Sequence, residues 1–229
     1  MATDLDGLRT LVRTNTLIES DDVTDTELLV YLNNAYNEIA AAYRWPWLET
    51  SANITVVAGT QAYAQPADYL RTIAIVDASE KRKLERISSD LALEEWGGDF
   101  DQSDPAAYYF MYGTNINLVP IPSANGTNAY IHYYIKQPTL LSTGTDTPEW
   151  TDEFHHILAD HASAEVWKRE EDLQKSDSYR TSFLQGLARM ADYYLNREED
   201  KPLVYGDGIK PLRRGTNTPF HGDGSLASW

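Results

Sequence analysis

The spacing of hydrophobic residues changes near residue 46, and this change constrains the fold more than any other feature of the sequence. Between residues 28 and 42, apolar side chains recur every three or four positions, as on one face of an α-helix. The stretch ITVVAGTQAYAQP, residues 54–66, instead has the residue types and the turn of a β-hairpin. The chain therefore combines a helical block with a β-rich block.

The helix before this change carries both a start signal and a stop signal. Thr24 and Glu27 have the spacing of a capping box, in which each side chain bonds the other residue's backbone N–H. Pro46 has no N–H and its ring clashes with the preceding turn, so we expect the helix to end at about Trp45. A shorter amphipathic helix is predicted over residues 3–14.

The predicted β-rich block contains six or seven strands and one short helix. In chain order, the patterns predict a hairpin over 54–66 that turns at 58–60, an antiparallel pair at 69–79 and 83–88, a helix at 89–98, a hairpin over 108–122 that turns at 113–115, and a strand at 129–138. Strands gathered in one block in this way favour a small antiparallel sandwich or barrel.

Helical spacing returns after residue 138, and it is lost again near the C-terminus. Thr151 precedes Asp152 and Glu153, whose carboxylates suit the positive end of a helix dipole. A break near residues 172–176 separates this helix from a last one. From residue 201 onward the chain holds five glycines and three prolines, which predicts an arm that is extended or disordered unless a partner holds it.

These patterns predict an α+β fold. It consists of a helical bundle formed by N- and C-terminal helices, an inserted antiparallel β-sandwich or barrel-like domain, and an extended C-terminal arm. The predicted segments are 1–50 for the N-terminal helices, 51–138 for the β-rich insertion with its short helix, 139–199 for the C-terminal helices, and 200–229 for the arm.

Charge is distributed unevenly along the chain. The formal net charge is −16, which disfavours a protein that reads free nucleic acid. Residues 201–229 hold four basic and two acidic residues, a balance of +2, so the first 200 residues carry −18. A basic arm on an acidic body suggests that the arm meets an acidic surface, such as that of a neighbouring copy.

The composition also limits the chemistry and the compartment that we expect. Cysteine is absent, which excludes disulfides and thiolate metal sites. The first residues lack the basic and apolar regions of a signal peptide, and no apolar run approaches the ~20 residues of a membrane span. We therefore expect no membrane association.

One cluster of titratable residues, TDEFHHILADHASAE at 151–165, has a spacing that suits a metal ion. His156 lies three residues after Glu153 and four before Asp160, so either pair can share an ion on a helix. The cluster lacks the HExxH arrangement, and the chain contains neither GxSxG nor a phosphate-binding glycine loop. Polar contacts around a helix start are favoured, so we expect no enzyme and no catalytic, cofactor-binding or metal-binding residue. A metal-dependent enzyme that uses the 153–160 cluster is the alternative.

Six tyrosines in the β-rich block form a second candidate site. Alternation along a strand places about half of them on each face of a sheet, and tyrosine is common at protein interfaces. Core packing with subunit contact is therefore favoured over a platform that stacks bases or binds carbohydrate. The six residues are Tyr108, Tyr109, Tyr112, Tyr130, Tyr133 and Tyr134.

Three segments, taken in order, indicate a protein family. The helix LNNAYNEIAAAYRWPWLE leads into ITVVAGTQAYAQPADYLRTIAIV, which holds the pattern Tyr-x-x-Pro-x-Asp-Tyr-x-Arg at 63–71. Helix returns at TPEWTDEFHHILADHASAEVWKREED, where a proline precedes a histidine by eight residues at 148–156. Over roughly residues 10–200 the chain resembles the adaptor, or head-to-tail connector, proteins of tailed bacteriophages.

The resemblance implies a structural virion protein that performs no chemistry. It implies a ring of identical subunits, twelve in this family, beneath the portal of the capsid. Helices form the ring body, the β-rich domain faces the next tail protein, and DNA passes through the middle without sequence-specific binding. The chain is then part of the neck or tail of the virion and is assembled in the host cytoplasm. A tail-tube or tail-completion subunit is the alternative.

Residue types assign the contacts that this role requires. In the arm, basic and aromatic residues are predicted to bind the portal: Lys210, Arg213, Arg214, Phe220 and Trp229. At the junction of the two blocks, Trp45, Pro46 and Trp47 are interpreted as a structural joint and not as a ligand pocket. In this interpretation Pro46 ends the helix, and the two indoles seal the gap between the helices and the β-rich block.

Overall fold

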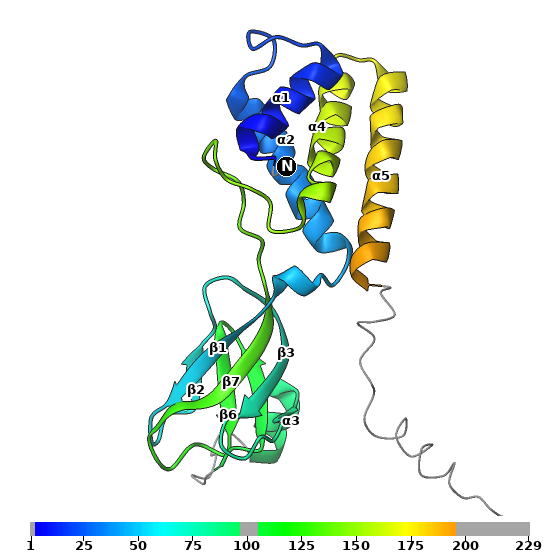
Figure 1. Cartoon of the computed structure of the whole chain (residues 1–229). Helices are drawn as coiled ribbons and strands as arrows, with labels where there is room; N and C mark the ends of the chain where they lie inside the picture. The colour runs from blue at the N-terminus through cyan, green and yellow to red at the C-terminus, as the bar shows by residue number, and fades with distance from the viewer. Residues whose placement is uncertain (1–2, 97–104, 196–229) are drawn as a thin grey trace, which may run out of the picture. The chain divides into compact units, whose positions relative to one another are not determined.

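The computed structural model describes residues 3–96 and 105–195, and it shows the expected mixture of helices and sheets (Figure 1). The elements are α1 (Leu5–Thr16), α2 (Asp25–Ala42), the 3₁₀ turn η1 (Pro46–Leu48), β1 (Glu49–Val56), β2 (Ala62–Ala64), β3 (Tyr69–Asp77), β4 (Glu85–Arg86), α3 (Ser89–Trp96), β5 (Tyr108–Tyr112), β6 (Asn115–Val119), β7 (Gly126–Lys136), the 3₁₀ turn η2 (Asp152–Phe154), α4 (His156–Arg169) and α5 (Leu173–Leu195). The chain divides into two compact units, residues 1–188 and residues 189–229. The α+β class is confirmed.

Local signals place the starts of the first two helices. Asp4 caps α1 by accepting a hydrogen bond from the backbone N–H of Gly7, at 2.9 Å. At the start of α2 the capping box is present in both directions: Glu27 N–H donates to Thr24 Oγ1 at 3.3 Å, and Thr24 N–H donates to Glu27 Oε2 at 2.8 Å. Both predicted helices are therefore confirmed.

The end of α2 differs from the prediction. The helix ends at Ala42, three residues before Trp45, and Tyr43 is already extended with φ −143°. Trp45 is extended too, as a residue before proline prefers to be, and Pro46 begins the turn η1. The Trp45 indole N–H donates to the carbonyl of Ile39 at 2.6 Å. A side chain thus satisfies a carbonyl that the end of the helix leaves without an intrahelical partner.

The strands form two sheets, and one predicted hairpin is wrong. The first sheet has the order β1-β7-β3 and the second has the order β2-β6-β5-β4. Residues 54–66 were expected to pair with each other, but β1 pairs with β7 and β2 pairs with β6. The tight turn between them is present, since Thr60 N–H bonds the Val57 carbonyl at 3.0 Å and Gly59 has φ +75°. This turn carries the chain from one sheet to the other.

The other strand predictions are closer to the structure. The hairpin at 108–122 is confirmed as the antiparallel pair β5–β6, and Gly113 supplies the positive φ of its turn. Lys83 bridges Val76 in the expected antiparallel sense, but β4 then pairs in parallel with β5. The second sheet is therefore mixed, and the described strands form no closed barrel.

One hydrophobic cluster draws on both sheets. Ile54 and Ile75 come from the first sheet, and Tyr109, Ile116 and Leu118 come from the second. This shared core is the burial that lets two small sheets be stable together. The sandwich geometry stays a prediction.

Helix α4 is the central helix of the helical part. Its apolar residues and small residues are buried on almost every side, and polar contacts tie it to its neighbours. Asn15 of α1 donates to Ser163 Oγ at 3.4 Å, and Ser176 Oγ of α5 donates to the Ala164 carbonyl at 2.9 Å. A Cβ at Gly186 of α5 would lie 2.8 Å from Ile157 Cγ1, so glycine permits the close approach of α5 to α4.

The predicted helix start at 151 needs a correction. The turn η2 follows Thr151, and the α-helix begins only at His156. The acidic first turn predicted from Asp152 and Glu153 is therefore a 3₁₀ turn. A break before the last helix is present, but it lies at residues 170–172, because α5 already begins at Leu173 and includes most of the predicted break at 172–176.

Candidate functional site

An aromatic cluster lies where the chain leaves the helices and where it returns to them. Trp45 is 0% exposed and stacks on Trp47, with ring centroids 6.0 Å apart. Trp47 in turn lies 5.0 Å from Trp150, and Trp150 meets Tyr36 of α2 edge to face at 4.7 Å. Pro46 is exposed. These contacts give the predicted joint residues their positions, and their role as a joint stays a prediction.

The segment that returns from β7 to η2 is fastened to the first two helices. Asn33 of α2 makes two hydrogen bonds to Leu141, donating to its carbonyl at 2.9 Å and accepting from its N–H at 3.0 Å. Leu5 N–H donates to the Asp146 carbonyl at 2.8 Å. Tyr36 accepts from Glu149 N–H at 3.0 Å, and burial raises the pKa of Tyr36 well above its ordinary value. The returning segment is therefore held at several points along its length.

Asn33→Ala is expected to lower the free energy of unfolding by about 2–3 kcal/mol. The substitution removes two hydrogen bonds and leaves a partly buried N–H and carbonyl of Leu141 without their partner. Urea unfolding followed by circular dichroism measures the change. Asn34→Ala on the exposed side of the same helix is the matched control, and it should shift stability by less than about 0.5 kcal/mol. Equal losses for the two variants would contradict the fastening role.

A polar network joins α2, α4 and α5. Arg180 of α5 binds both carboxylate oxygens of Glu38, at 3.0 and 2.5 Å, and His161 of α4 lies 3.1 Å from Glu38. The hydrogen bond from Arg180 is the main cause that holds the pKa of Glu38 below its usual value. Burial lowers the pKa of His161, so the imidazole is neutral at pH 7 and its ring packs edge to face on Phe183. The network fixes the mutual position of the three helices.

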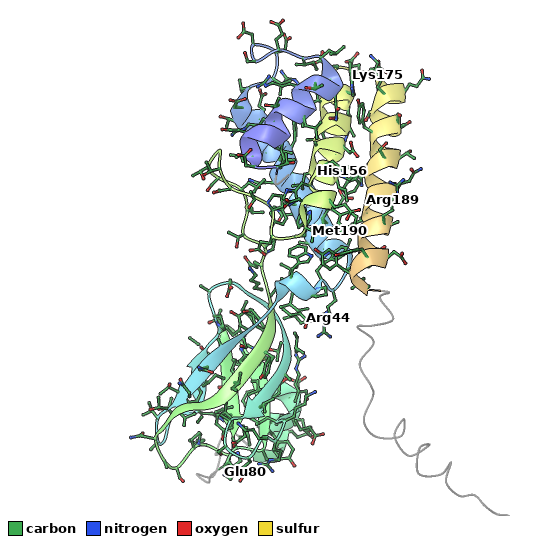
Figure 2. All side chains as sticks on the ribbon, viewed as in Figure 1. Arg44, Glu80, His156, Lys175, Arg189 and Met190 are labelled. Carbon is green, nitrogen blue, oxygen red and sulfur yellow. The ribbon has the colours of Figure 1, made fainter. Side chains whose placement is uncertain are left out.

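The 153–160 cluster, which was the alternative metal site, does not come together as a group of ligands. His156 is exposed on the first turn of α4 (Figure 2), and its Nδ1 lies 2.9 Å from the backbone carbonyl of Glu153, not from its carboxylate. Asp160 is half-buried, and burial raises its pKa. Among residues 3–96 and 105–195, no group of three or more histidines and carboxylates is placed to hold a metal ion.

A neighbouring histidine that the sequence did not single out is structural. His155 is buried, with Nε2 3.0 Å from the Trp150 carbonyl and Nδ1 3.1 Å from the Thr3 carbonyl. It therefore links the start of the chain to the aromatic cluster.

The six tyrosines separate into core and surface positions. Tyr109, Tyr130 and Tyr134 are buried, and Tyr130 Oη accepts from Ala106 N–H at 2.8 Å. Tyr112 and Tyr133 are exposed large side chains. The buried three are structural, as predicted for about half of the set.

The predicted portal-binding residues and the last two positions of the helix predicted at 89–98 lie outside the described residues. The former are Lys210, Arg213, Arg214, Phe220 and Trp229. Among the helices that the structure describes, none combines the length and the apolar character that crossing a bilayer requires.

Comparison with known proteins identifies the family. No curated protein matches the chain. One family model, described as SU10 adaptor protein, matches residues 3–206, and this range contains every helix and strand of the structure. The chain therefore belongs to the SU10 adaptor protein family, and the predicted resemblance to bacteriophage head-to-tail adaptors is confirmed.

Proposed function

We propose that the chain is a ring-forming adaptor that connects the portal to the tail of a tailed bacteriophage and continues the channel for DNA. The observation that carries this proposal is the family match over residues 3–206. The order of helices, β-rich segment and helices supports it, because it is the order that the resemblance implies for a ring body with an appended β-rich part. The proposed role requires no catalysis.

The charge of the chain supports passage of DNA through the ring without a grip on it. The first 200 residues carry −18, and carboxylates around a channel repel the phosphate backbone. Proteins that hold DNA tightly instead neutralise phosphates with lysine and arginine and release counterions. We therefore propose a channel wall on which DNA slides. The family implies twelve copies in the ring.

The arm supplies the proposed contact with the portal. Ordering an unstructured segment costs about 1–2 kcal/mol per residue in backbone entropy, so the contact must be extensive. Phe220 and Trp229 are large enough to anchor it, while Lys210, Arg213 and Arg214 bind an acidic surface. The β-rich part is then the side that meets the next tail protein.

Reversing the charge of the arm tests the portal contact. Full-length chain with Lys210→Glu, Arg213→Glu and Arg214→Glu is expected to bind isolated portal particles at least about tenfold more weakly than the unchanged chain at 150 mM salt. A truncation to residues 1–200 should weaken binding to portal particles more than the triple variant does. Co-sedimentation measures the bound fraction.

The control for this experiment carries the same kind of change elsewhere. Lys81→Glu alters an exposed lysine of the β-rich part and should leave portal binding unchanged. If the triple variant and the truncation sediment with portal particles as well as the unchanged chain does, the arm is not the portal contact. Images of the intact particle distinguish an adaptor from a tail-tube or tail-completion subunit.

A further inference from the structure

The outer face of α2 is exposed and carries no charge. Val30, Asn34, Asn37 and Ala41 recur at one-turn spacing on this face, and Val30 is 52% exposed. The one charged residue between positions 28 and 42 is Glu38, which the network with His161 and Arg180 already occupies. Charged residues make up 24% of the chain, so this face lacks the groups that ordinarily solvate a helix.

Helix α5 presents a second face of the same kind. Thr181, Leu184 and Ala188 are exposed at one-turn spacing, and Leu184 is 51% exposed. No charged residue lies between positions 181 and 188. Small and uncharged side chains on both helices allow close contact without burying an unpaired charge.

A groove of about 520 Å³ continues the α2 face beyond the end of the helix. Its lining combines three alanines with exposed apolar and basic side chains: Ala40, Ala41, Ala42, Tyr43, Arg44, Leu70, Arg71 and Ile135. Leu70 is 56% exposed, and Arg44 (Figure 2) pairs with Glu49 at 2.8 Å. Arg71 is exposed, and no ion pair to it is found in the part of the chain that the structure describes. This groove therefore suits an acidic partner.

Helices α2 and α5 run in the same direction. Arg169, at the end of α4, pairs with Glu27, at the start of α2, so α2 and α4 are antiparallel. Ser176 of α5 contacts Ala164 and Gly186 approaches Ile157, so α5 and α4 are antiparallel as well. Cyclic symmetry preserves direction between copies, so α5 of one copy and α2 of the next also run in the same direction. The residues that follow α5 in the sequence, Glu198, Glu199 and Asp200, are acidic, so the sequence after α5 is opposite in charge to the basic groove.

We propose that the uncharged face of α2, with its basic groove, receives α5 of a second copy of this chain. The proposal rests on the proposed ring and names the two faces through which its copies meet. Copies with a net charge of −16 repel each other, so they associate through surfaces that keep carboxylates apart. A ring also needs two different faces on each copy, because only a head-to-tail contact closes a ring of many subunits.

Two single substitutions test the pairing of the faces. Asn37→Glu places a carboxylate on the uncharged face of α2, and Leu184→Glu places one on the uncharged face of α5. Each change lies at an exposed position, so circular dichroism should show an unchanged fold. Mass photometry of the pure chain, alone and with portal particles, is expected to show assembly of the unchanged chain and at least a tenfold higher concentration for half-assembly of either variant.

Mixing the two variants gives the sharpest readout. An equimolar mixture retains one intact pair of faces per two chains, so it should form dimers and nothing larger. Thr14→Glu on exposed α1 is the matched control and should assemble like the unchanged chain. Because the chain has no cysteine, a double variant Asn37→Cys and Leu184→Cys should give a ladder of covalent oligomers on oxidation, whereas Thr14→Cys should not.

The possible outcomes separate the two proposals. If the unchanged chain assembles and both glutamate variants assemble equally well, the faces are wrong while the ring stands. If only Asn37→Glu is impaired and Leu184→Glu assembles like the unchanged chain, α2 contacts something other than this face of α5. If the unchanged chain assembles neither alone nor with portal particles, the proposal of a ring is wrong, and the proposed pair of faces is wrong as well.

Discussion

Trp45→Ala is expected to reduce the free energy of unfolding by about 3–5 kcal/mol, one of the two largest effects that we predict. The side chain is 0% exposed and stacks against Trp47, so alanine leaves a cavity inside the aromatic cluster. The same change removes the hydrogen bond to the Ile39 carbonyl, which the end of α2 leaves without an intrahelical partner. Urea unfolding at pH 7 measures the loss.

Two further variants separate packing from hydrogen bonding. Trp45→Phe keeps an aromatic ring but has no N–H, so its loss should be smaller and should include about 1–3 kcal/mol for the unsatisfied carbonyl. Pro46→Ala alters the exposed neighbour and should change stability by no more than about 1 kcal/mol, through the flexibility of the unfolded chain. A loss below 1 kcal/mol for Trp45→Ala would show that the cluster is not a packed core.

Acidification from pH 6.5 to pH 4 is expected to cost the folded chain about 3 kcal/mol through His132 alone. This histidine is 0% exposed in β7, and burial lowers its pKa to about 4. The unfolded chain binds the proton near pH 6.5, whereas the folded chain resists it. The stabilisation is therefore complete above pH 6.5 and is lost as the pH falls towards the folded pKa. His161, whose pKa is also lowered by burial, contributes in the same direction.

A substitution that cannot titrate isolates the contribution of His132. His132→Phe keeps a ring between Tyr69 and Tyr134, and the Thr72 hydroxyl retains Tyr69 Oη at 3.1 Å. The fall in unfolding free energy between pH 6.5 and pH 4 should shrink by about 3 kcal/mol in this variant. His156→Gln, which changes a histidine at an exposed position, is the control. A profile that His132→Phe does not change would show that this histidine becomes protonated without opposing the fold.

Features set by residues close in sequence were predictable. Thr24 and Glu27 lie three positions apart, so the start of α2 follows from the local chain. The turn at Gly113 was predictable for the same reason, since glycine readily supplies the positive φ that this hairpin turn needs. The order of the helical and β-rich segments along the chain was also enough to indicate the family.

Features set by distant residues were not predictable from spacing. The turn at Gly59 is local, but whether its flanking strands pair depends on β6 and β7, which lie more than 50 residues further along the chain. Helix α2 ends at Ala42, where the indole N–H of Trp45, beyond the helix, donates to the carbonyl of Ile39. Helix propensities of single residues do not include such a side-chain contact. Trp150 and Tyr36 were missed for the same reason, since the contact between these two rings joins positions 114 residues apart.

The candidate metal site shows the limit of spacing arguments. Glu153, His156 and Asp160 have helical separations that suit an ion, yet helix α4 begins only at His156. Glu153 therefore lies in a different turn geometry, and its backbone carbonyl takes the contact with the imidazole. A boundary shifted by a few residues is enough to remove a predicted ligand pair.

The contact between Trp47 and Trp150 has a consequence for the evolution of such chains. Their rings are 5.0 Å apart, although the whole β-rich segment lies between them in sequence. A segment whose entry and exit are neighbours can be exchanged as a cassette, because a replacement of any length meets the same pair of anchor points. Recombination within this segment therefore replaces the β-rich part and leaves the helices, and the ring that we propose they build, unaltered.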